Sequence, residues 1–299
     1  MISVTRHYKI WFSISAFFIG ASIIAIALWG LAPGIDFRGG VQAELTFERE
    51  VNSQQITEEL QTAGFTGVVV QPVGERGTLI KSAALDEARL AKLKDTLQTK
   101  FGGFEEISFE SIGPSIGREL TTRAYWQVIL VVLGIVFYIA YAFRKIGQLA
   151  QNAKIAAWHL GMATIVALIH DIIIPLGLFA ILGKYRAVEV DGLFITALLT
   201  ILGFSVHDTI VVFDRIRENL QKYPHKHLAT LIDYSVNSTL ARSINTSSTL
   251  IFVLIAMLLF GGQTIFYFVL ALLVGVTFGT YSSIFIASPI LYLWHRNKT

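Results

Sequence analysis

The chain has 299 residues, of which 54% are hydrophobic and 15% are charged, and its formal net charge at pH 7 is +3. Roughly a quarter of the residues of a soluble domain are charged, so this composition excludes an ordinary water-soluble protein and indicates a membrane protein. Because the sequence contains no cysteine, disulfide bonds and thiolate metal sites are also excluded.

Six apolar runs approach or exceed the length of about 20 residues that a helix needs to cross the bilayer. They are residues 10–31, 125–143, 156–182, 192–213, 244–260 and 265–294. The first run is longer than the apolar core of a signal peptide, so residues 1–32 are predicted to be a cytoplasmic N-terminus and an uncleaved first transmembrane helix. The basic loops 144–155 and 214–243 predict that both chain ends face the cytoplasm.

Residues 33–122 form a predicted small domain, acidic and soluble in composition, on the opposite, periplasmic side of the membrane. The alternation and capping patterns predict strands and helices in the order βαββαβ, which is the ferredoxin-like order. The strands are expected at residues 41–47, 67–73, 77–83 and 104–112, and the helices at 53–65, opened by Ser53, and 86–101.

Two glycine-bearing stretches, "GIDFRGG" (34–40) and "SIGPSIGREL" (111–120), flank this domain. Glycine permits backbone conformations that other residues resist, so the stretches are interpreted either as turns or as a hinge between domain and bilayer. The first lacks the Lys-Ser/Thr of a phosphate-binding loop, which argues against nucleotide binding. The candidate hinge residues are Gly34, Asp36, Arg38, Gly39, Gly40, Gly113 and Gly117.

The remaining residues, 123–299, are predicted to hold transmembrane helices 2–6, with a cytoplasmic linker helix at about 214–240. Charges in that linker are spaced as on a helix, and they indicate either a solvated face or a docking surface. In the last span, Gly275 and Gly279 belong to a face of small residues spaced by four, which favours close helix packing, within this chain or in a dimer.

Asp208 in "GFSVHDTIVVFDRIREN" lies roughly 8 Å inside the cytoplasmic end of the fourth span, at about 1.5 Å per helical residue. A carboxyl group at this depth is costly and normally faces water or a polar bundle interior. Arg242, at the start of the fifth span, is its predicted ion-pair partner. The polar stripes beside these residues, which include His207, suggest a shared water-accessible path for protons.

A second acid, Asp171, is expected near the middle of the third span, directly after His170. For both acids the alternative is a static ion pair or hydrogen bond that only fixes helix packing. The two His-Asp pairs also leave open a metal site, although no cluster of ligands supports one.

With these motifs, the chain resembles the SecF members of the SecD/SecF family, within the RND superfamily of proton-driven membrane proteins. The resemblance runs nearly end to end and is carried by "GIDFRGG", "SIGPSIGREL", "ALIHD", "GFSVHDTIVVFDRIREN", "LARSINTSSTL", "LFGG" and "GTYSSIFIASPIL". It implies a six-helix membrane half with one small periplasmic domain in the bacterial inner membrane. His207 departs from the asparagine usual before the acid, and "LARSIN" departs from the usual "LSRTI".

The resemblance also implies a function: together with SecD, the chain uses the proton gradient to promote polypeptide export through SecYEG, with YajC and YidC as further partners. It implies that Asp208 handles the proton, that Arg242 is its basic partner, and that Asp171 has a less defined role. The predicted proton relay therefore consists of Asp208, Arg242, Asp171 and His207. No catalytic group and no cofactor other than the proton motive force is expected. The rival functions are an RND-type exporter of small molecules or lipids, an intramembrane aspartyl protease using both acids, and a passive scaffold.

Overall fold

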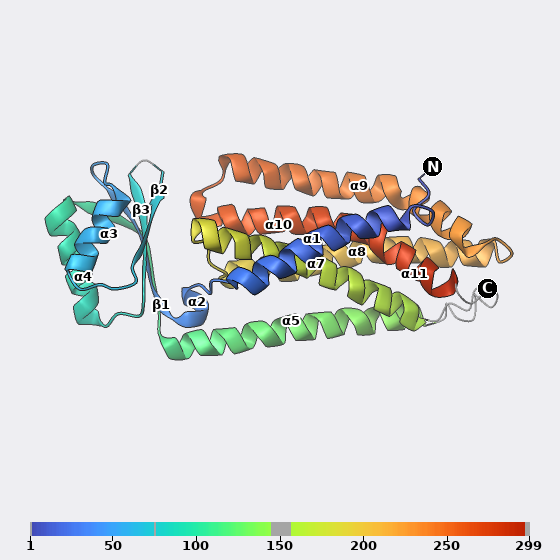
Figure 1. Cartoon of the computed structure of the whole chain (residues 1–299), viewed down its shortest axis with the longest axis horizontal. Coiled ribbons are helices and arrows are strands. Elements are labelled where there is room, and N and C mark those ends of the chain that lie inside the picture. Colours follow the sequence, from blue (N-terminus) through green and yellow to red (C-terminus); the bar gives the residue numbers. More distant parts are fainter. Residues whose placement is uncertain (1, 75, 145–156, 297–299) are drawn as a thin grey trace. The chain divides into compact units, whose positions relative to one another are not determined.

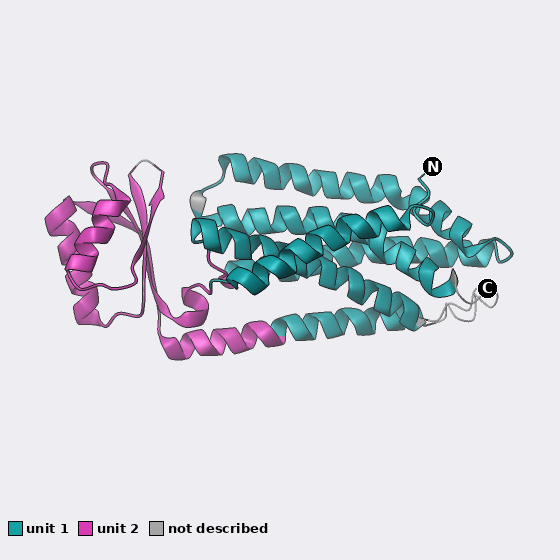
Figure 2. Cartoon of the chain, viewed as in Figure 1, with its two compact units in different colours: residues 1–32, 127–188, 193–299 teal, residues 33–126, 189–192 magenta. Residues whose placement is uncertain are grey.

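The computed structural model of the chain describes residues 2–74, 76–144 and 157–296 (Figure 1). It contains two compact units, called here the membrane unit and the domain unit (Figure 2). The membrane unit comprises residues 1–32, 127–188 and 193–299, and the domain unit comprises residues 33–126 and 189–192. The short segment 189–192 therefore belongs with the small domain although it lies between two membrane helices in sequence.

The domain unit is built on one four-stranded antiparallel sheet with the strand order β2-β3-β1-β4. The strands are β1 (Gly40–Phe47), β2 (Val69–Val73), β3 (Gly77–Ser82) and β4 (Phe104–Ile112), and the two longer helices are α3 (Ser53–Thr62) and α4 (Glu87–Phe101). Alternate residues of β1 are buried against residues of both helices, including Ile56, Leu60, Leu93 and Leu97. This arrangement confirms the predicted ferredoxin-like α+β fold.

Side-chain caps determine where the domain's two longer helices begin. Asp86 accepts a hydrogen bond from the backbone N–H of Arg89 and so caps α4, as its acidic start suggested. For α3 the cap is Asn52, which accepts from the N–H of Gln54, and the predicted cap Ser53 is instead the first helical residue.

The two glycine-bearing stretches are more structured than a flexible hinge. A short helix, α2 (Ile35–Arg38), forms inside the first, and the long helix α5 (Pro114–Ala142) begins inside the second. Gly39 has φ +77, which favours glycine, but Gly117 lies within α5. A Cβ atom on Gly117 would lie 2.8 Å from the backbone nitrogen of Gly39. Gly117 therefore permits close packing and not a turn, which corrects that part of the hinge prediction.

Among the described residues, six helices are long and apolar enough to cross a membrane, which confirms the predicted number of spans. The spans use α1 (Tyr8–Trp29), α5, α7 (Ala157–Arg186), α8 (Gly192–Lys222), α9 (Leu228–Phe260) and α10 (Gln263–Ser282), the last continued by η1 (Ser283–Ala287) and α11 (Ser288–Arg296). The chain is therefore a multi-pass membrane protein.

The cytoplasmic linker helix predicted at 214–240 does not exist as one element. Residues 214–222 form the end of α8, residues 228–240 form the start of α9, and a turn at 223–227 separates them. Pro224 explains the break, because proline has no backbone N–H and its ring clashes with a preceding helical turn. The two helix ends are joined by a hydrogen bond of 2.7 Å from Asn219 to the Oγ of Ser235.

Small residues let α1 pack closely on α7 in the membrane unit. The buried positions of α1 are Ser15, Ser22 and Ala25. A Cβ atom on Gly177 of α7 would lie 2.4 Å from the Cα atom of Ser22, so only glycine fits there. Such close backbone approach is typical of helices packed in membranes. The sequence analysis found a small-residue face only in the last span and missed this one.

The last span changes its helical geometry after Ser282, where α10 passes into the π-helical segment η1. A π-helical turn accommodates one extra residue and is rare in proteins. It therefore changes which residues of the last span face each neighbour, and this could not be read from the spacing of the sequence.

Candidate functional site: two buried acids in the membrane unit

Close packing of α10 on α8 sets the framework of the site. A Cβ atom on Gly275 would lie 2.1 Å from Cδ1 of Ile201, and one on Gly279 would lie 3.1 Å from the Cβ of Ser205. The small-residue face that the sequence indicated is therefore directed at another helix of the same chain. This packing places hydroxyl groups of α8 and α10 next to the third span.

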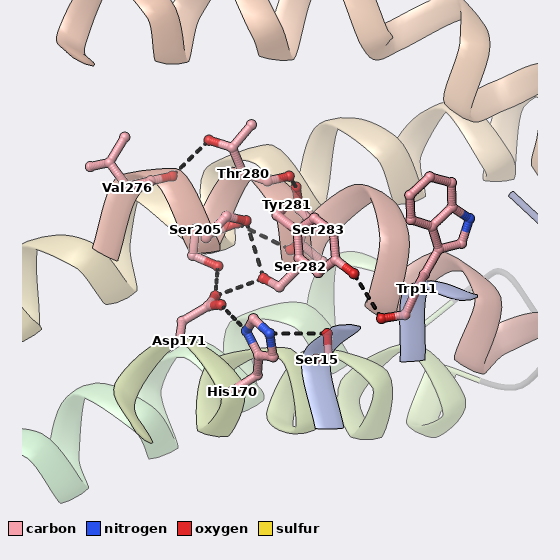
Figure 3. Close-up of polar contacts among 12 residues, drawn as sticks. Trp11, Ser15, His170, Asp171, Ser205, Val276, Thr280, Tyr281, Ser282 and Ser283 are labelled. Carbon is pink, nitrogen blue, oxygen red and sulfur yellow. Dashed lines mark hydrogen bonds and ion pairs between the residues drawn. The ribbon is translucent and has the colours of Figure 1, made fainter. Parts of the chain in front are cut away.

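Asp171 of α7 is fully buried and surrounded by hydrogen-bond donors (Figure 3). Its Oδ2 accepts from Ser205 of α8 at 2.5 Å and from Ser282 of α10 at 2.8 Å. Its Oδ1 lies 2.8 Å from Nδ1 of His170, the preceding residue. Hydrogen bonds to charged groups are the stronger ones, so this carboxyl group joins three helices at one point.

The His170 ring extends this network to a fourth helix. Its Nε2 lies 3.2 Å from Oγ of Ser15 in α1. The ring also stacks on Tyr281, with centroids 6.0 Å apart, and the hydroxyl of Tyr281 donates to the carbonyl of Trp11 at 2.7 Å (Figure 3). The network around Asp171 therefore ties α1, α7, α8 and α10 together. The predicted pair of His170 and Asp171 is real, and Ser15, Ser205 and Ser282 are partners that the sequence analysis did not identify.

Asp208 of α8 is also buried, with 2% of its surface exposed, but its surroundings differ. The side chains of Ser243 and Ser247 in α9 face its carboxyl group. Nevertheless, its Oδ2 and the Oγ of Ser243 have no hydrogen-bond partner among the described residues. A buried carboxylate oxygen without a donor is costly, so the charge of Asp208 depends strongly on what reaches it.

A hydroxyl link connects the Asp208 surroundings to the last span. The Oγ of Ser247 lies 2.6 Å from Oγ1 of Thr280 in α10, two residues before Ser282, which contacts Asp171. The same short stretch of α10 therefore contacts Asp171 directly, through Ser282, and contacts Ser247, which faces Asp208. No sequence pattern marks these hydroxyls individually, although the motif "GTYSSIFIASPIL" contains two of them.

The predicted ion pair between Asp208 and Arg242 is wrong for this conformation. Arg242 is exposed, and the structure forms no ion pair between it and Asp208. The reason is helical geometry: successive residues of a helix are about 100° apart, so when Ser243 and Ser247 face α8 the neighbouring Arg242 points elsewhere. The rotation of α9 about its axis, which the sequence does not indicate, decides this.

The two polar stripes of α8 and α9 both lie on the exposed surface of the membrane unit. In α8 every member of the predicted stripe is exposed, namely Thr196, Thr200, Gly203 and His207. In α9 they are Arg242, Asn245, Thr246 and Thr249. His207 is thus adjacent in sequence to the buried Asp208 but itself exposed. Polar side chains that are exposed within the membrane-spanning part of a helix normally face water or another protein.

A second group of predicted residues lies in the domain unit. Arg38 forms an ion pair of 2.7 Å with Glu189, and Asp36 accepts a hydrogen bond of 2.6 Å from the backbone N–H of Gly192. Gly34 donates to the carbonyl of Val190 at 2.7 Å. These "GIDFRGG" residues therefore contact the segment 189–192, a connection that no sequence pattern indicated. Two candidate glycines remain. Gly40 has φ +152, a backbone conformation that residues with a side chain rarely adopt, whereas a Cβ atom on Gly113 would have no other atom within 4 Å.

Among the described residues, no group of three or more His, Cys, Asp or Glu side chains could hold a metal ion. Asp171 is accompanied by one histidine and two serine hydroxyls, and Asp208 by two serine hydroxyls, which are poor ligands for transition metals. The arrangement suits proton exchange or helix packing better than metal chemistry.

Comparisons with known proteins agree with this geometry. Residues 92–297 match a family model described as "Protein export membrane protein SecD/SecF, C-terminal". Two curated relatives are named "Protein translocase subunit SecF". The one from Thermobaculum terrenum is 42% identical over 99% of this chain and 95% of its own length, and the one from Anaerolinea thermophila is 37% identical over 100% and 96%.

Solved structures show the same fold. A crystal structure of SecDF from Thermus thermophilus, described as a translocon-associated membrane protein, has a TM-score of 0.85 and 30% identity and covers 98% of this chain. A structure of SecDF in a "Super-membrane-facing form" has a TM-score of 0.66 and 31% identity. The present chain spans only 38% of each of these SecDF chains.

Proposed function

The chain belongs to the SecD/SecF family of protein export membrane proteins, and from this premise we propose how it works as a protein translocase subunit. With a SecD partner in the bacterial cytoplasmic membrane, it couples inward proton flow to the export of polypeptides. Asp208 carries the proton, and the small domain acts on the polypeptide outside the membrane. The observation that carries this proposal is the buried Asp208 carboxyl group, which lacks a donor for Oδ2.

The surroundings of Asp208 support a proton carrier. A carboxyl group that is protonated can donate its proton to a hydroxyl such as that of Ser243, whereas a charged one requires water or a cation. His207 and Arg242 are exposed on the same two helices, so either can approach Asp208 when the helices shift or when a partner covers them. We therefore retain Asp208, Arg242 and His207 as the proposed relay.

The SecD partner is supported by exposed surface. The window of α5 that would span the membrane is 6% buried and that of α9 is 17% buried, against 50% for α7, α8 and the last span. Exposed Arg242 and Asn245 on α9 would be costly against lipid, so a protein surface is the better neighbour. SecYEG, YajC and YidC are proposed as further partners from the family relationship alone.

Orientation follows from the positions of the basic residues. Arg144 follows α5, and Lys222 and Lys226 lie at the turn between α8 and α9, as cytoplasmic ends require. We propose that both chain ends are cytoplasmic and that the domain unit is periplasmic. The working energy source is the proton motive force, with no bound cofactor.

The decisive experiment replaces the proposed proton carrier. Asp208→Asn removes the titrating group but keeps the shape of the side chain, so proton-gradient-stimulated export should fall to the unstimulated rate in vesicles containing SecD, SecYEG and this subunit. The matched control is Asp214→Asn on the same helix, an exposed acid paired with Arg217, which should export normally. Normal stimulated export by Asp208→Asn would show that this acid does not carry the proton.

The rival functions each lack a specific observation in their favour. An aspartyl protease requires two carboxyl groups that share a proton. Here Asp171 bonds to His170, Ser205 and Ser282, while Asp208 faces side chains of α9. An exporter of small molecules would release a transported compound from this complex, which the same vesicles can test.

A further inference from the structure

The loop between α7 and α8 is built into the base of the domain unit. Residues 189–192 of this loop belong to the domain unit, where Pro33 and Val190 form a parallel β-bridge. The backbone of the loop is also bonded to this base, because Gly34 donates a hydrogen bond of 2.7 Å to the carbonyl of Val190. This connection is therefore an ordered part of the fold.

Glu189 is the centre of the contacts that hold the loop. Its Oε1 lies 2.7 Å from Nη2 of Arg38, and its Oε2 lies 2.8 Å from Nζ of Lys81 on β3. The side chains of Glu189 and Lys81 are each only 11% exposed. Ion pairs sheltered from solvent are less screened than surface pairs, and here both carboxylate oxygens have cationic partners.

A second carboxylate connects the same base to the start of a membrane helix. Oδ2 of Asp36 accepts a hydrogen bond of 2.6 Å from the backbone N–H of Gly192, the first residue of α8. The first N–H groups of a helix have no hydrogen-bond partner within the helix. A carboxylate at this end accepts a hydrogen bond from one of them and interacts favourably with the positive end of the helix dipole. A Cβ atom on Gly192 would lie 3.1 Å from this oxygen, so glycine permits the approach.

We propose that Glu189 is a positioning residue that, with Asp36, clamps Gly192, the first residue of α8, within the domain unit. Because α8 is one continuous helix from Gly192 to Lys222, the clamped end and Asp208 belong to the same rigid element. A movement of the domain unit then displaces α8, because the clamped loop cannot change its conformation to compensate. This inference rests on the proposed function, in which proton exchange at Asp208 is coupled to domain movement.

The structure offers a covalent replacement for the clamp. An ideal Cβ on Gly34 would lie 3.3 Å from the Cβ of Asp191, close to the separation of about 3.5–4.5 Å found in disulfides. Gly34 has φ −73 and ψ 178, which cysteine adopts without strain. Since the chain has no cysteine of its own, the Gly34→Cys, Asp191→Cys pair can form only one disulfide within the chain, and non-reducing electrophoresis distinguishes it from a disulfide between chains.

The test combines this disulfide with Glu189→Gln in vesicles containing SecD and SecYEG. Glu189→Gln keeps the shape of the side chain but removes the charge that pairs with both Arg38 and Lys81, so proton-gradient-stimulated export should fall about tenfold. A second chain carries Glu189→Gln together with both cysteines, and its oxidation should restore export. The restored rate should lie within about twofold of the rate of the double-cysteine chain that keeps Glu189, and reduction should remove the rescue. Glu110→Gln, an exposed acid on β4, and Glu189→Gln with only one cysteine serve as controls.

Three results would each overturn the inference. Either undiminished export by Glu189→Gln, or a formed disulfide that fails to restore export, would show that Glu189 does not act by holding the loop. Hydrogen exchange at the Gly192 amide gives a readout independent of transport, and Glu189→Gln should accelerate it; unchanged exchange would also reject the clamp. If the unmodified complex shows no gradient stimulation, the proposed function fails, whereas the exchange measurement still decides the clamp.

Discussion

Asp171 and Asp208 are two buried aspartates of one membrane unit, and their surroundings differ in kind. Asp171 is bonded to His170, Ser205 and Ser282, and through His170 to Ser15 of the first span. Asp208 faces two serines, yet its Oδ2 has no hydrogen-bond partner among the described residues. The first acid is satisfied by neighbours from several helices, and the second is not.

The comparison distinguishes an acid that holds helices together from an acid that exchanges a proton. An acid held by several donors loses those bonds whenever it moves or changes charge, so it favours a fixed arrangement of helices. An acid without such bonds can change partners at little structural cost. We therefore propose that Asp171 anchors the helices, in place of the relay role predicted from the sequence, and that Asp208 exchanges the proton. Three stability measurements test this distinction.

The largest effect is expected from Asp171→Leu. Leucine removes the acceptor for His170, Ser205 and Ser282 and leaves buried polar groups unpaired, which should cost about 3–5 kcal/mol of unfolding free energy. Thermal unfolding of the detergent-purified protein measures this change. The matched control, Asp214→Leu, removes an exposed acid of α8 and should change stability by about 0.5 kcal/mol or less. Equal stability of the two variants would contradict an anchoring role.

A smaller effect is expected when Asp171 keeps its charge but loses one donor. Ser205→Ala removes the hydrogen bond to Oδ2 and should cost about 1–2 kcal/mol. The same unfolding measurement applies, with Thr277→Ala as control, because Thr277 is exposed and its hydroxyl bonds only within α10. A Ser205→Ala protein as stable as this control would mean that the hydroxyl contributes nothing to the anchor.

The smallest structural effect is expected from Asp208→Asn, the variant that should abolish stimulated export. Asparagine has the shape of aspartate and breaks no hydrogen bond that the structure forms at Oδ2, so unfolding free energy should change by about 0.5 kcal/mol or less. Calorimetry or thermal unfolding of the purified subunit checks this. A loss as large as that of Asp171→Leu would make Asp208 a second anchor and remove the contrast.

Local patterns allowed much of the fold to be predicted. Alternation and capping placed the strands and helices of the domain, because a half-buried strand and a capped helix each leave a short-range signature. The linker helix at 214–240 was wrong because the charge spacing on either side of Pro224 resembles one helix when the proline is overlooked. Asn52 was missed as a cap because Ser53 beside it is an equally good capping residue.

The candidate site was predictable in its acids but not in their partners. Asp171 and Asp208 stand out because charges are rare in apolar spans. Ser15, Ser205 and Ser282 do not, since single serines are common in membrane helices and form no pattern with residues far away in sequence. Glu189 was missed for the same reason: one acid in a short loop has no signature until its cationic partners are known.

The sequence by itself determined that this is a six-span membrane protein with a small ferredoxin-like domain, two buried acids and a SecD/SecF relationship, because hydropathy, periodicity and motifs are properties of neighbouring residues. The tertiary structure was needed to show that Arg242 points away from Asp208, that Asp171 is bonded across helices, and that Glu189 pairs with Arg38 and Lys81. Those facts depend on helix rotation and on contacts between residues more than a hundred positions apart, which no local pattern encodes.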